Sequence, residues 1–239
     1  MPGLITSAEA VMRASERRLE AASANVANVS TPGYKRQVSF ADLVGASGAG
    51  EMDSVDTLLT HVRADMAQGK LAATGNPLDI AISGDGMFAL RNGTEIVYSR
   101  QGQFHLAADG TVTTAQGLVL QQAGGGDLVL DHAAVTIAAD GAVTDGGQTV
   151  GKIALFAAPA GSIVDPIGGS MFRMSQGAGE EVASPQLRQG MVEASNVSIG
   201  DEMVTMMAAL RQAESGAKLA QTWDDLLGRV ITNFGGGGQ

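Results

Sequence analysis

The sequence predicts an α+β protein in which a mainly-β central domain is carried between paired, coiled-coil-like helices at the two ends of the chain. Three observations support this fold class. Apolar and small residues recur every three or four positions near both ends, which is the period of one helix face. Between the ends, short alternating runs are separated by glycine-containing turns, as in a β domain of short strands. Glycine supplies 33 of the 239 residues, which suits a chain with many turns.

The first predicted helix runs from residue 1 to about residue 30. Pro32 biases Thr31 toward extended geometry, and Gly33 supplies the backbone freedom for a sharp exit. We therefore expect an N-terminal assembly helix within residues 1–33. The apolar stripe of this helix consists of Leu4, Ala8, Val11, Ser15, Leu19, Ala22, Val26 and Val29.

An extended or irregular connecting segment is predicted over residues 34–75. Within it, residues 35–43 have the composition of an extended segment, whereas residues 56–66 could form either a short helix or a strand. Residues 45–50 read as a loop.

A β domain is predicted over residues 76–190. Residues 78–82 alternate strictly, which predicts a half-buried strand. Residues 86–99 predict a hairpin, because the Asn92-Gly93 pair favours a tight turn with positive φ. The segment 107–113 (AADGTVT) returns as 138–144 (AADGAVT), and two copies are too few for a solenoid. We expect two hairpins that share their turn chemistry.

The last range, residues 191–239, is predicted to form the C-terminal assembly helix and a glycine-rich tail. Asp201 and Glu202 would lie at the helix start, where negative charge meets the positive end of the helix dipole. The stripe that follows has the spacing of a coiled coil. It consists of Met203, Met206, Leu210, Ala213, Ala217, Ala220, Trp223, Leu227, Ile231 and Phe234.

Charge and composition exclude several classes of partner. The formal charge of −10 argues against nucleic acid and anionic membrane as main partners. No window reaches the ~20 apolar residues of a membrane span, so we expect no membrane insertion. Residues 1–5 lack the basic start and apolar run of a cleaved signal peptide. On this basis the protein is either cytoplasmic or exported without signal cleavage.

No catalytic or cofactor-binding constellation emerges from the sequence. Residues 146–152 match seven positions of a phosphate-binding loop, but Ile153 stands where Ser or Thr should bind magnesium. The three histidines, His61, His105 and His132, share no metal-ligand spacing. There is no cysteine, so no thiolate chemistry is available. We expect a protein that is not an enzyme and holds no cofactor or metal.

The two terminal stripes point to assembly. Neither helix is stable alone in water, so each must bury its stripe, and its natural partner is the helix at the other end. Small side chains such as Ala8, Ala22 and Ala217 bury little area at ~25 cal/mol per Å², so the pair needs further copies around it. Asn25 and Asn28 share a helix face from which their amides could cross-link neighbours. The alternative is a soluble β-domain binding module that the two helices merely cap.

Four stretches of the sequence resemble the rod and hook proteins of the bacterial flagellum, in the family's order along the chain. Residues 24–34 (ANVANVSTPGY) resemble its N-terminal signature and residues 74–88 (TGNPLDIAISGDGMF) its second block. Residues 193–197 (EASNV) with 202–204 (EMV) resemble its C-terminal block, and residues 99–104 (SRQGQF) fit a family hairpin. The short connecting segment and modest β region are most similar to the proximal rod protein, the F member. A distal-rod or hook member of the same family is the alternative, although those members are typically longer.

This resemblance implies a structural subunit of the basal-body rod, the axial drive shaft that crosses the periplasm. It also implies that the chain is exported through the flagellar type III export apparatus without signal cleavage. Its partners would then be that apparatus, other copies of itself and neighbouring rod proteins. The residues expected to form subunit interfaces are Leu4, Ala8, Val11, Leu19, Ala22, Asn25, Val26, Asn28, Val29, Glu193, Ser195, Asn196, Val197, Met203, Met206, Leu210, Ala217, Leu227 and Ile231.

Overall fold

The computed structural model describes residues 3–42, 59–175 and 177–235, and these residues confirm an α+β fold with a mostly β centre and a helix near each end. Backbone contacts divide the chain into two compact units. The first, here called the helical unit, comprises residues 1–26, 38–62 and 198–239. The second, here called the β unit, comprises residues 27–37 and 63–197. The four ranges predicted from the sequence stay predictions, and the glycine tail lies outside the described residues.

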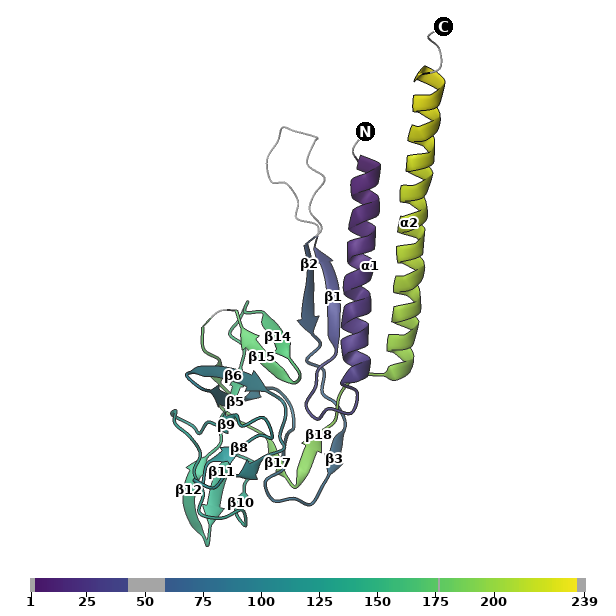
Figure 1. The fold of residues 1–239 in the computed structure, drawn as a ribbon. Coiled ribbons are helices and arrows are strands. Elements are labelled where there is room, and N and C mark those ends of the chain that lie inside the picture. Colours follow the sequence, from purple (N-terminus) through teal and green to yellow (C-terminus); the bar gives the residue numbers. More distant parts are fainter. Residues whose placement is uncertain (1–2, 43–58, 176, 236–239) are drawn as a thin grey trace. The chain divides into compact units, whose positions relative to one another are not determined.

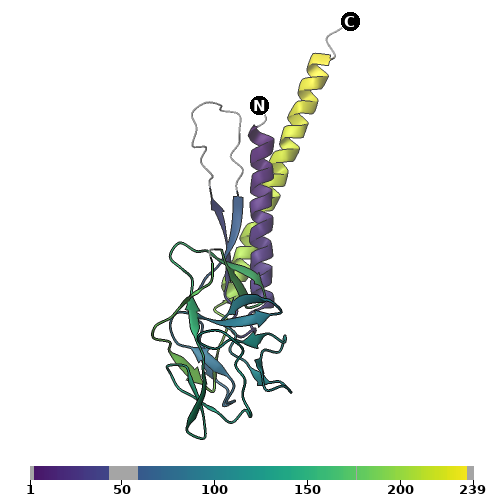
Figure 2. The ribbon, with the colours of Figure 1, turned by 90° about the vertical axis from the view of Figure 1, so that its left-hand side faces the viewer.

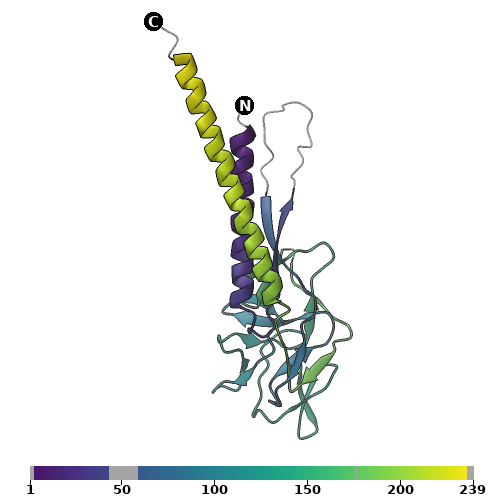
Figure 3. The same ribbon diagram turned by 90° about the vertical axis from the view of Figure 1, so that its right-hand side faces the viewer.

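The helical unit contains two long helices that run side by side in opposite directions (Figure 1). They are α1 (Gly3–Ala27) and α2 (Ile199–Gly235), and Figures 2 and 3 show the same pairing from two further sides. Strands β1 (Gln37–Asp42) and β2 (Leu59–Ala64), which begin and end at the boundary with the β unit, form a two-stranded sheet. The extended geometry expected for residues 35–43 is confirmed by β1. For the described part of residues 56–66, the choice left open is decided in favour of a strand, β2, while residues 56–58 and the loop predicted for residues 45–50 lie outside the described residues.

The largest sheet of the β unit runs in the order β14-β15-β6-β5-β9-β8-β7, with β13 and β16 joined through β5. Its central strands are the predicted hairpin, paired from Phe88 with Ser99 to Asn92 with Glu95. Gly93 in its turn has φ +62°, as the Asn-Gly signal requires. The strands are β5 (Met87–Asn92), β6 (Glu95–Ser99), β7 (His105–Leu106), β8 (Val112–Thr113), β9 (Val119–Leu120), β13 (Leu155–Ala157), β14 (Val164–Gly168), β15 (Met171–Met174) and β16 (Glu180–Glu181).

Three smaller sheets complete the β unit. Strands β10 (Thr136–Ile137), β11 (Ala142–Asp145) and β12 (Gln148–Lys152) form one of them. Strand β4 (Ile80–Ile82) pairs with β17 (Leu187–Gln189), and β3 (Leu71–Ala73) pairs with β18 (Met191–Glu193). Residues 146–147 are the turn between β11 and β12, so the partial phosphate-loop match is a hairpin connection.

The core of the β unit is aliphatic with a few aromatic rings. Phe88, Leu90, Leu120, Ile153 and Leu155 are fully buried, and the ring of Phe88 meets that of Phe104 edge-on at 5.3 Å. Such burial stabilises a fold by roughly 1.5–3 kcal/mol per large side chain. The β unit therefore has a complete core of its own.

The half-buried strand predicted for residues 78–82 is wrong. All five residues are buried, including Asp79 and Ala81, which the alternating pattern placed on a solvent face. Asp79 tolerates this because Asn76 donates a hydrogen bond to its carboxylate at 3.1 Å and Gly190 donates one to its carbonyl at 2.7 Å. The alternating pattern implied that water would solvate Asp79, whereas hydrogen bonds from Asn76 and Gly190 take that role inside the protein.

The two AADG segments confirm the predicted pair of similar turns. In the first, Ala107 N–H donates to Thr111 O and Gly110 N–H donates to Ala107 O. In the second, Ala138 and Gly141 make the equivalent bonds at 2.8 and 3.0 Å. Each turn also forms a backbone hydrogen bond with a further segment of the chain. The N–H of Leu130 donates to Gly110 O, and the N–H of Ile153 donates to Gly141 O, both at 2.8 Å.

Candidate functional site

Small side chains form the buried seam between α1 and α2. On α1 the buried positions Ala8, Ser15 and Ala22 lie seven residues apart. On α2 the buried positions Glu202, Ala209 and Gly216 are also seven apart. A repeat of seven returns to one helix face with a drift of only about 20°, so each series marks a continuous stripe.

The contacts across this seam are close. A Cβ placed on Gly216 would lie 2.9 Å from Met12 Cγ and 3.5 Å from the carbonyl oxygen of Ala8. Further along, the Arg18 guanidinium donates to Gln212 Oε1 at 2.9 Å. Because the helices are antiparallel and both series step by seven, the same register sets Ser15 against Ala209 and Ala22 against Glu202. Glycine and alanine allow the two backbones to approach closely.

The predicted stripe of α2 is displaced by one residue from this seam. Met203 and Leu210 are 56% and 49% exposed, and Leu227 is exposed as well, whereas Glu202 and Ala209 face α1. Met206 and Ala217 lie half-buried at the edge. The expectation that α1 covers the bulky stripe is therefore wrong for Met203 and Leu210, which lie one residue past the seam, and for Leu227, which lies beyond the end of α1. The small residues permit a tighter contact than the bulky ones, and the bulky ones point away from it.

The predicted interface residues of α1 lie nearer to the seam. Ala8 and Ala22 are buried, and Val11, Leu19 and Val26 are half-buried. Leu4 and Ile231 belong to the helices, but their side chains lie outside the described part of the structure.

The two asparagines of the N-terminal motif differ in their surroundings. Asn25, near the end of α1, is fully buried. Asn28 and Val29 are half-buried in the turns that follow, where Thr31 donates hydrogen bonds from its backbone N–H and its hydroxyl to Asn28. Their role between subunits stays a prediction.

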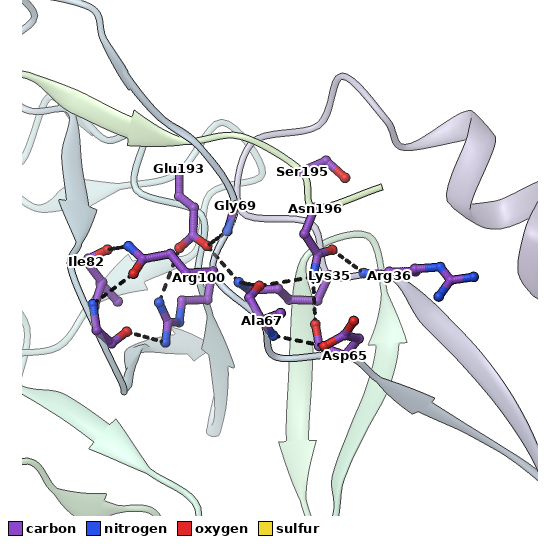
Figure 4. Close-up of polar contacts among 12 residues, drawn as sticks. Lys35, Arg36, Asp65, Ala67, Gly69, Ile82, Arg100, Glu193, Ser195 and Asn196 are labelled. Carbon is purple, nitrogen blue, oxygen red and sulfur yellow. Dashed lines mark hydrogen bonds and ion pairs between the residues drawn. The ribbon is translucent and has the colours of Figure 1, made fainter. Parts of the chain in front are cut away.

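A buried charge cluster in the β unit brings three of the sequence motifs together (Figure 4). The carboxylate of Glu193, on β18, is 0% exposed. It accepts from Lys35 Nζ at 2.6 Å, from the Arg100 guanidinium at 3.2 Å and from the Gly69 backbone N–H at 2.8 Å. Lys35 directly follows the N-terminal motif, and Arg100 follows β6. We call Lys35, Arg100 and Glu193 the charge cluster.

Backbone groups hold the two cations from the other side. Lys35 Nζ also donates to Ala67 O at 2.7 Å, and Arg100 donates to Gly84 O at 2.8 Å. Burial lowers the pKa of the Lys35 amine, although the hydrogen bond and the negative charge of Glu193 act in the opposite direction. Removing one member would leave an unpaired buried charge, so the cluster couples its strands strongly.

Gly33 fits this region only because it has no side chain. Its φ is +69°, and a Cβ would lie 2.3 Å from the carbonyl carbon of Arg100 and from Gln101 N. Its N–H donates to the backbone carbonyl of Glu193 at 2.8 Å. The glycine of the N-terminal motif thus touches the backbone of both later members of the charge cluster.

Asn196 connects the same segments with its side-chain amide. Its Oδ1 accepts from Arg36 N–H at 2.7 Å, and its Nδ2 donates to the carbonyls of Asp65 at 2.9 Å and Ala67 at 3.0 Å (Figure 4). Ser195 accepts from Val197 N–H at 3.3 Å, and both residues are half-buried. Glu193 and Asn196 therefore make contacts inside the chain that the sequence had assigned to the space between subunits.

Lys35 and Arg100 were missed by sequence reasoning. Lys35 is 158 residues from Glu193 and Arg100 is 93 residues away, so no local spacing reveals the cluster. One signal in the sequence did point to the charge cluster. Its three residues lie within or directly beside the family-like motifs, and none of them has a partner of opposite charge nearby in the sequence.

The described residues offer neither a cluster of metal-ligating side chains nor a membrane-spanning helix. Within residues 3–42, 59–175 and 177–235, no three His, Cys, Asp or Glu side chains lie close enough together to hold a metal ion. No helix in the described part of the chain is both long and apolar enough to cross a membrane.

The site and fold define a class: a structural protein whose chain ends pair as helices and whose connecting segments are clamped inside a β unit. Three family descriptions match the chain in order. "Flagella basal body rod protein" matches residues 5–35, "Flagellar hook protein FlgE/F/G D1 domain" residues 81–145, and "Flagellar basal body rod FlgEFG protein C-terminal" residues 188–233.

Curated relatives match over most of their length. The flagellar basal-body rod protein FlgG of Bacillus subtilis (strain 168) is 31% identical, over 92% of this chain and 94% of the relative. FlgF of Caulobacter vibrioides is 30% identical over 92% of each chain, and FlgF of Escherichia coli K12 is 33% identical over 87% and 88%. The chain belongs to the flagellar basal-body rod protein family. Its function is that of a structural rod subunit.

Proposed function

We propose that this rod subunit assembles through its terminal helices into the axial drive shaft, and that its α1–α2 pair is an antiparallel coiled coil. One observation carries the proposal: both chain ends enter one unit, through a seam that repeats every seven residues. Seven-residue repeats are the mark of a supercoiled pair. Other copies and neighbouring rod proteins would pack around this pair.

The charge cluster supports a mechanical role for the β unit. The chain crosses between the two units after residues 26, 37, 62 and 197. Lys35 and Arg36, Asp65 and Asn196 each lie within a few residues of a crossing. A load carried by the helices would enter the β unit through segments that the charge cluster and Asn196 join to one another. The load would then be shared by these segments, and no single strand would have to carry it alone.

Alignment lengths favour the F type of rod subunit, the proximal member of the family resemblance. The match to Caulobacter FlgF spans 227 positions with 92% of this chain, which leaves about 7 positions opposite a gap. The match to Bacillus FlgG spans 257 positions with the same share, which leaves about 37. Percentage identity is similar for the two types, so the smaller number of gap positions is the observation that favours the F type.

The remaining parts of the proposal concern place and partners. The subunit would act in the periplasmic rod, without enzymatic activity, membrane insertion or nucleic-acid binding. It would reach the rod through the flagellar type III export apparatus with no cleaved signal peptide. The family relationship supports this proposal, and so does the acidic composition of the chain.

A glycine pair on α2 separates this proposal from the capping alternative. Gly216→Leu would force a side chain against Met12 and Val11, whereas Gly228→Leu meets nothing within 4 Å. Both changes raise helix propensity by a similar ~1 kcal/mol, so they differ only in the seam. We expect Gly216→Leu to abolish rods, scored by electron microscopy of basal bodies from cells producing the variant as the sole copy, and Gly228→Leu to retain them.

The stability of each unit can be followed separately in these variants. The single tryptophan, Trp223, lies in α2, and both tyrosines, Tyr34 and Tyr98, lie in the β unit. With Gly216→Leu, the tyrosine near-UV signal should melt as in the wild type while Trp223 fluorescence changes. A tyrosine transition that shifts with the tryptophan signal would instead show that the helices serve to cap the β unit.

A further inference from the structure

A bare apolar stripe runs along the first three turns of α2, away from α1. Ile199, Met203, Met207 and Leu210 follow one another at steps of four, four and three residues, and each is about half exposed. They share one helix face, about 100° from the buried Glu202 and Ala209 at 100° per residue. Nothing described in this chain covers that face. We call these four residues the basal stripe.

The opposite end of α2 is also unpaired, because α2 is longer than α1. Gly216 packs at Ala8, and α1 begins five residues before Ala8, at Gly3, level with about residue 221 of α2. The last 14 residues of α2 therefore extend beyond α1 by about 21 Å at ~1.5 Å per residue. Figures 2 and 3 show this overhang from both sides.

The overhang carries large apolar side chains and continues the seven-residue repeat of the seam. Leu226 and Leu227 are exposed on it, and Trp223 occupies the next seven-residue position after Gly216. The indole N–H of Trp223 is shielded from solvent and has no hydrogen-bond partner in the described part of the chain. The seam of α2 thus continues past the first residue of α1, Gly3, where α1 no longer covers it.

We propose that the overhang of one copy docks on the basal stripe of a second copy, so that the chain assembles head to tail. The two surfaces are similar in length, since the stripe runs over 12 residues of helix, or about 17 Å from Ile199 to Leu210 at ~1.5 Å per residue, against about 21 Å for the overhang. They lie at opposite ends of one straight helix, so they cannot meet within one molecule. Met203 and Met207 suit this contact because flexible thioethers adapt to a partner's surface.

This inference rests on the proposed rod function and specifies the partner surface. A contact between two different patches of the same chain does not close after one step, and its repetition generates a filament when the rotation from copy to copy does not close a ring. The small-residue seam would hold each subunit together, while the bulky stripe and overhang would join one subunit to the next.

Charge insertion at each end tests the inference. Met207→Glu removes the stripe but leaves the overhang intact, and Leu226→Glu does the reverse. Ser215→Glu, an exposed site between the two, is the control. We expect each of the first two variants of the purified full chain to lose all higher oligomers in sedimentation, and their equimolar mixture to form a heterodimer and nothing longer. Ser215→Glu should associate as the wild type does.

Cysteine pairing locates the contact directly, because the chain has no cysteine of its own. A mixture of Met207→Cys and differently tagged Leu226→Cys should give the mixed disulfide as its main product, with Ser215→Cys giving none. A disulfide between two Met207→Cys chains as the main product would show a two-fold interface and would overturn the inference. An absence of pairing between purified chains would also overturn it, since another protein would then cover the stripe.

Rods in cells distinguish this inference from the proposed function. If Met207→Glu leaves rods intact while Gly216→Leu abolishes them, the head-to-tail contact is wrong and the helical assembly role stands. If both variants build normal rods, both proposals are wrong.

Discussion

The two units of this chain differ in the size and charge of the side chains that they bury. The β unit has a core of large apolar side chains such as Phe88 and Leu155, and it also encloses Lys35, Arg100 and Glu193 with partners for each. The helical unit buries alanine, serine and glycine and leaves Met203, Met207 and Leu210 in solvent. The β unit has a closed core, whereas the helical unit leaves large apolar side chains exposed. These exposed side chains are the ones that the proposed contacts between copies would cover.

The charge cluster gives the largest expected effect on the β unit. Glu193→Gln keeps the shape of the side chain but leaves two buried cations without a counter-charge. We expect it to lower the free energy of unfolding by about 3–5 kcal/mol and the melting midpoint by roughly 10 °C. Tyrosine near-UV circular dichroism measures this transition.

The matched control is Glu95→Gln. Glu95 binds Arg173 at 2.7 Å, but both side chains are about half exposed, so its loss should change the midpoint little. Equal shifts in the two variants would show that the charge cluster contributes no more than a surface ion pair.

Two glycines of similar backbone geometry sharpen the comparison between an enclosed position and an open one. Gly33 has φ +69° and Gly93 has φ +62°, so alanine is strained by about 1–2 kcal/mol at either position. Only at Gly33 does the added Cβ also meet backbone, at 2.3 Å, while nothing lies within 4 Å at Gly93. Gly33→Ala should therefore destabilise the β unit by about 1–3 kcal/mol more than Gly93→Ala, measured by urea unfolding. If the two losses are the same, the close approach to Arg100 carries no energetic weight.

The smallest effect concerns a surface contact of the β unit and depends on pH. Hydrogen bonds from Arg91 and then Gln121 hold the pKa of the Asp127 carboxyl below its ordinary value. A carboxylate with a lowered pKa stabilises the fold above its unfolded-state pKa, and this contribution is lost as pH falls through the folded-state pKa. Asp127→Asn should thus lower the melting midpoint at pH 7 by less than Glu193→Gln does, and the difference from the wild type should shrink as the pH falls below the ordinary Asp pKa of about 3.9.

The exposed Asp85→Asn is the comparison variant, with midpoints recorded from pH 7 to pH 2. A deficit of Asp127→Asn that persists at pH 2 would contradict the charge-based explanation.

Local signals predicted the fold well where the chemistry itself is local. The Asn92-Gly93 hairpin and the paired AADG turns follow from the φ values and hydrogen bonds of a few neighbouring residues. The helices at both ends follow from periodicity. The strand at residues 78–82 was misread because alternation reports the polarity of a side chain, and Asp79 finds its partners inside the protein.

The candidate sites depended on distant residues, and there the sequence was a weaker guide. Periodicity located an apolar stripe on α2 but could not tell which of two neighbouring faces meets α1. The answer depended on how closely two backbones approach at Ala209 and Gly216. The charge cluster was invisible because its members come from separate parts of the chain and only the fold brings them together.

The separation of 158 residues between Lys35 and Glu193 also has a consequence for the order of folding. Contacts between distant residues form slowly, because the entropy of closing a long loop must be overcome first. The hairpin at residues 86–99 can form early, and Gly33 can settle only against a backbone that is already in place. We therefore expect the chain ends to join last, so that the helices pair only after the β unit is complete. A newly folding subunit would then expose its joining surfaces at the latest possible moment, which limits premature association with other copies.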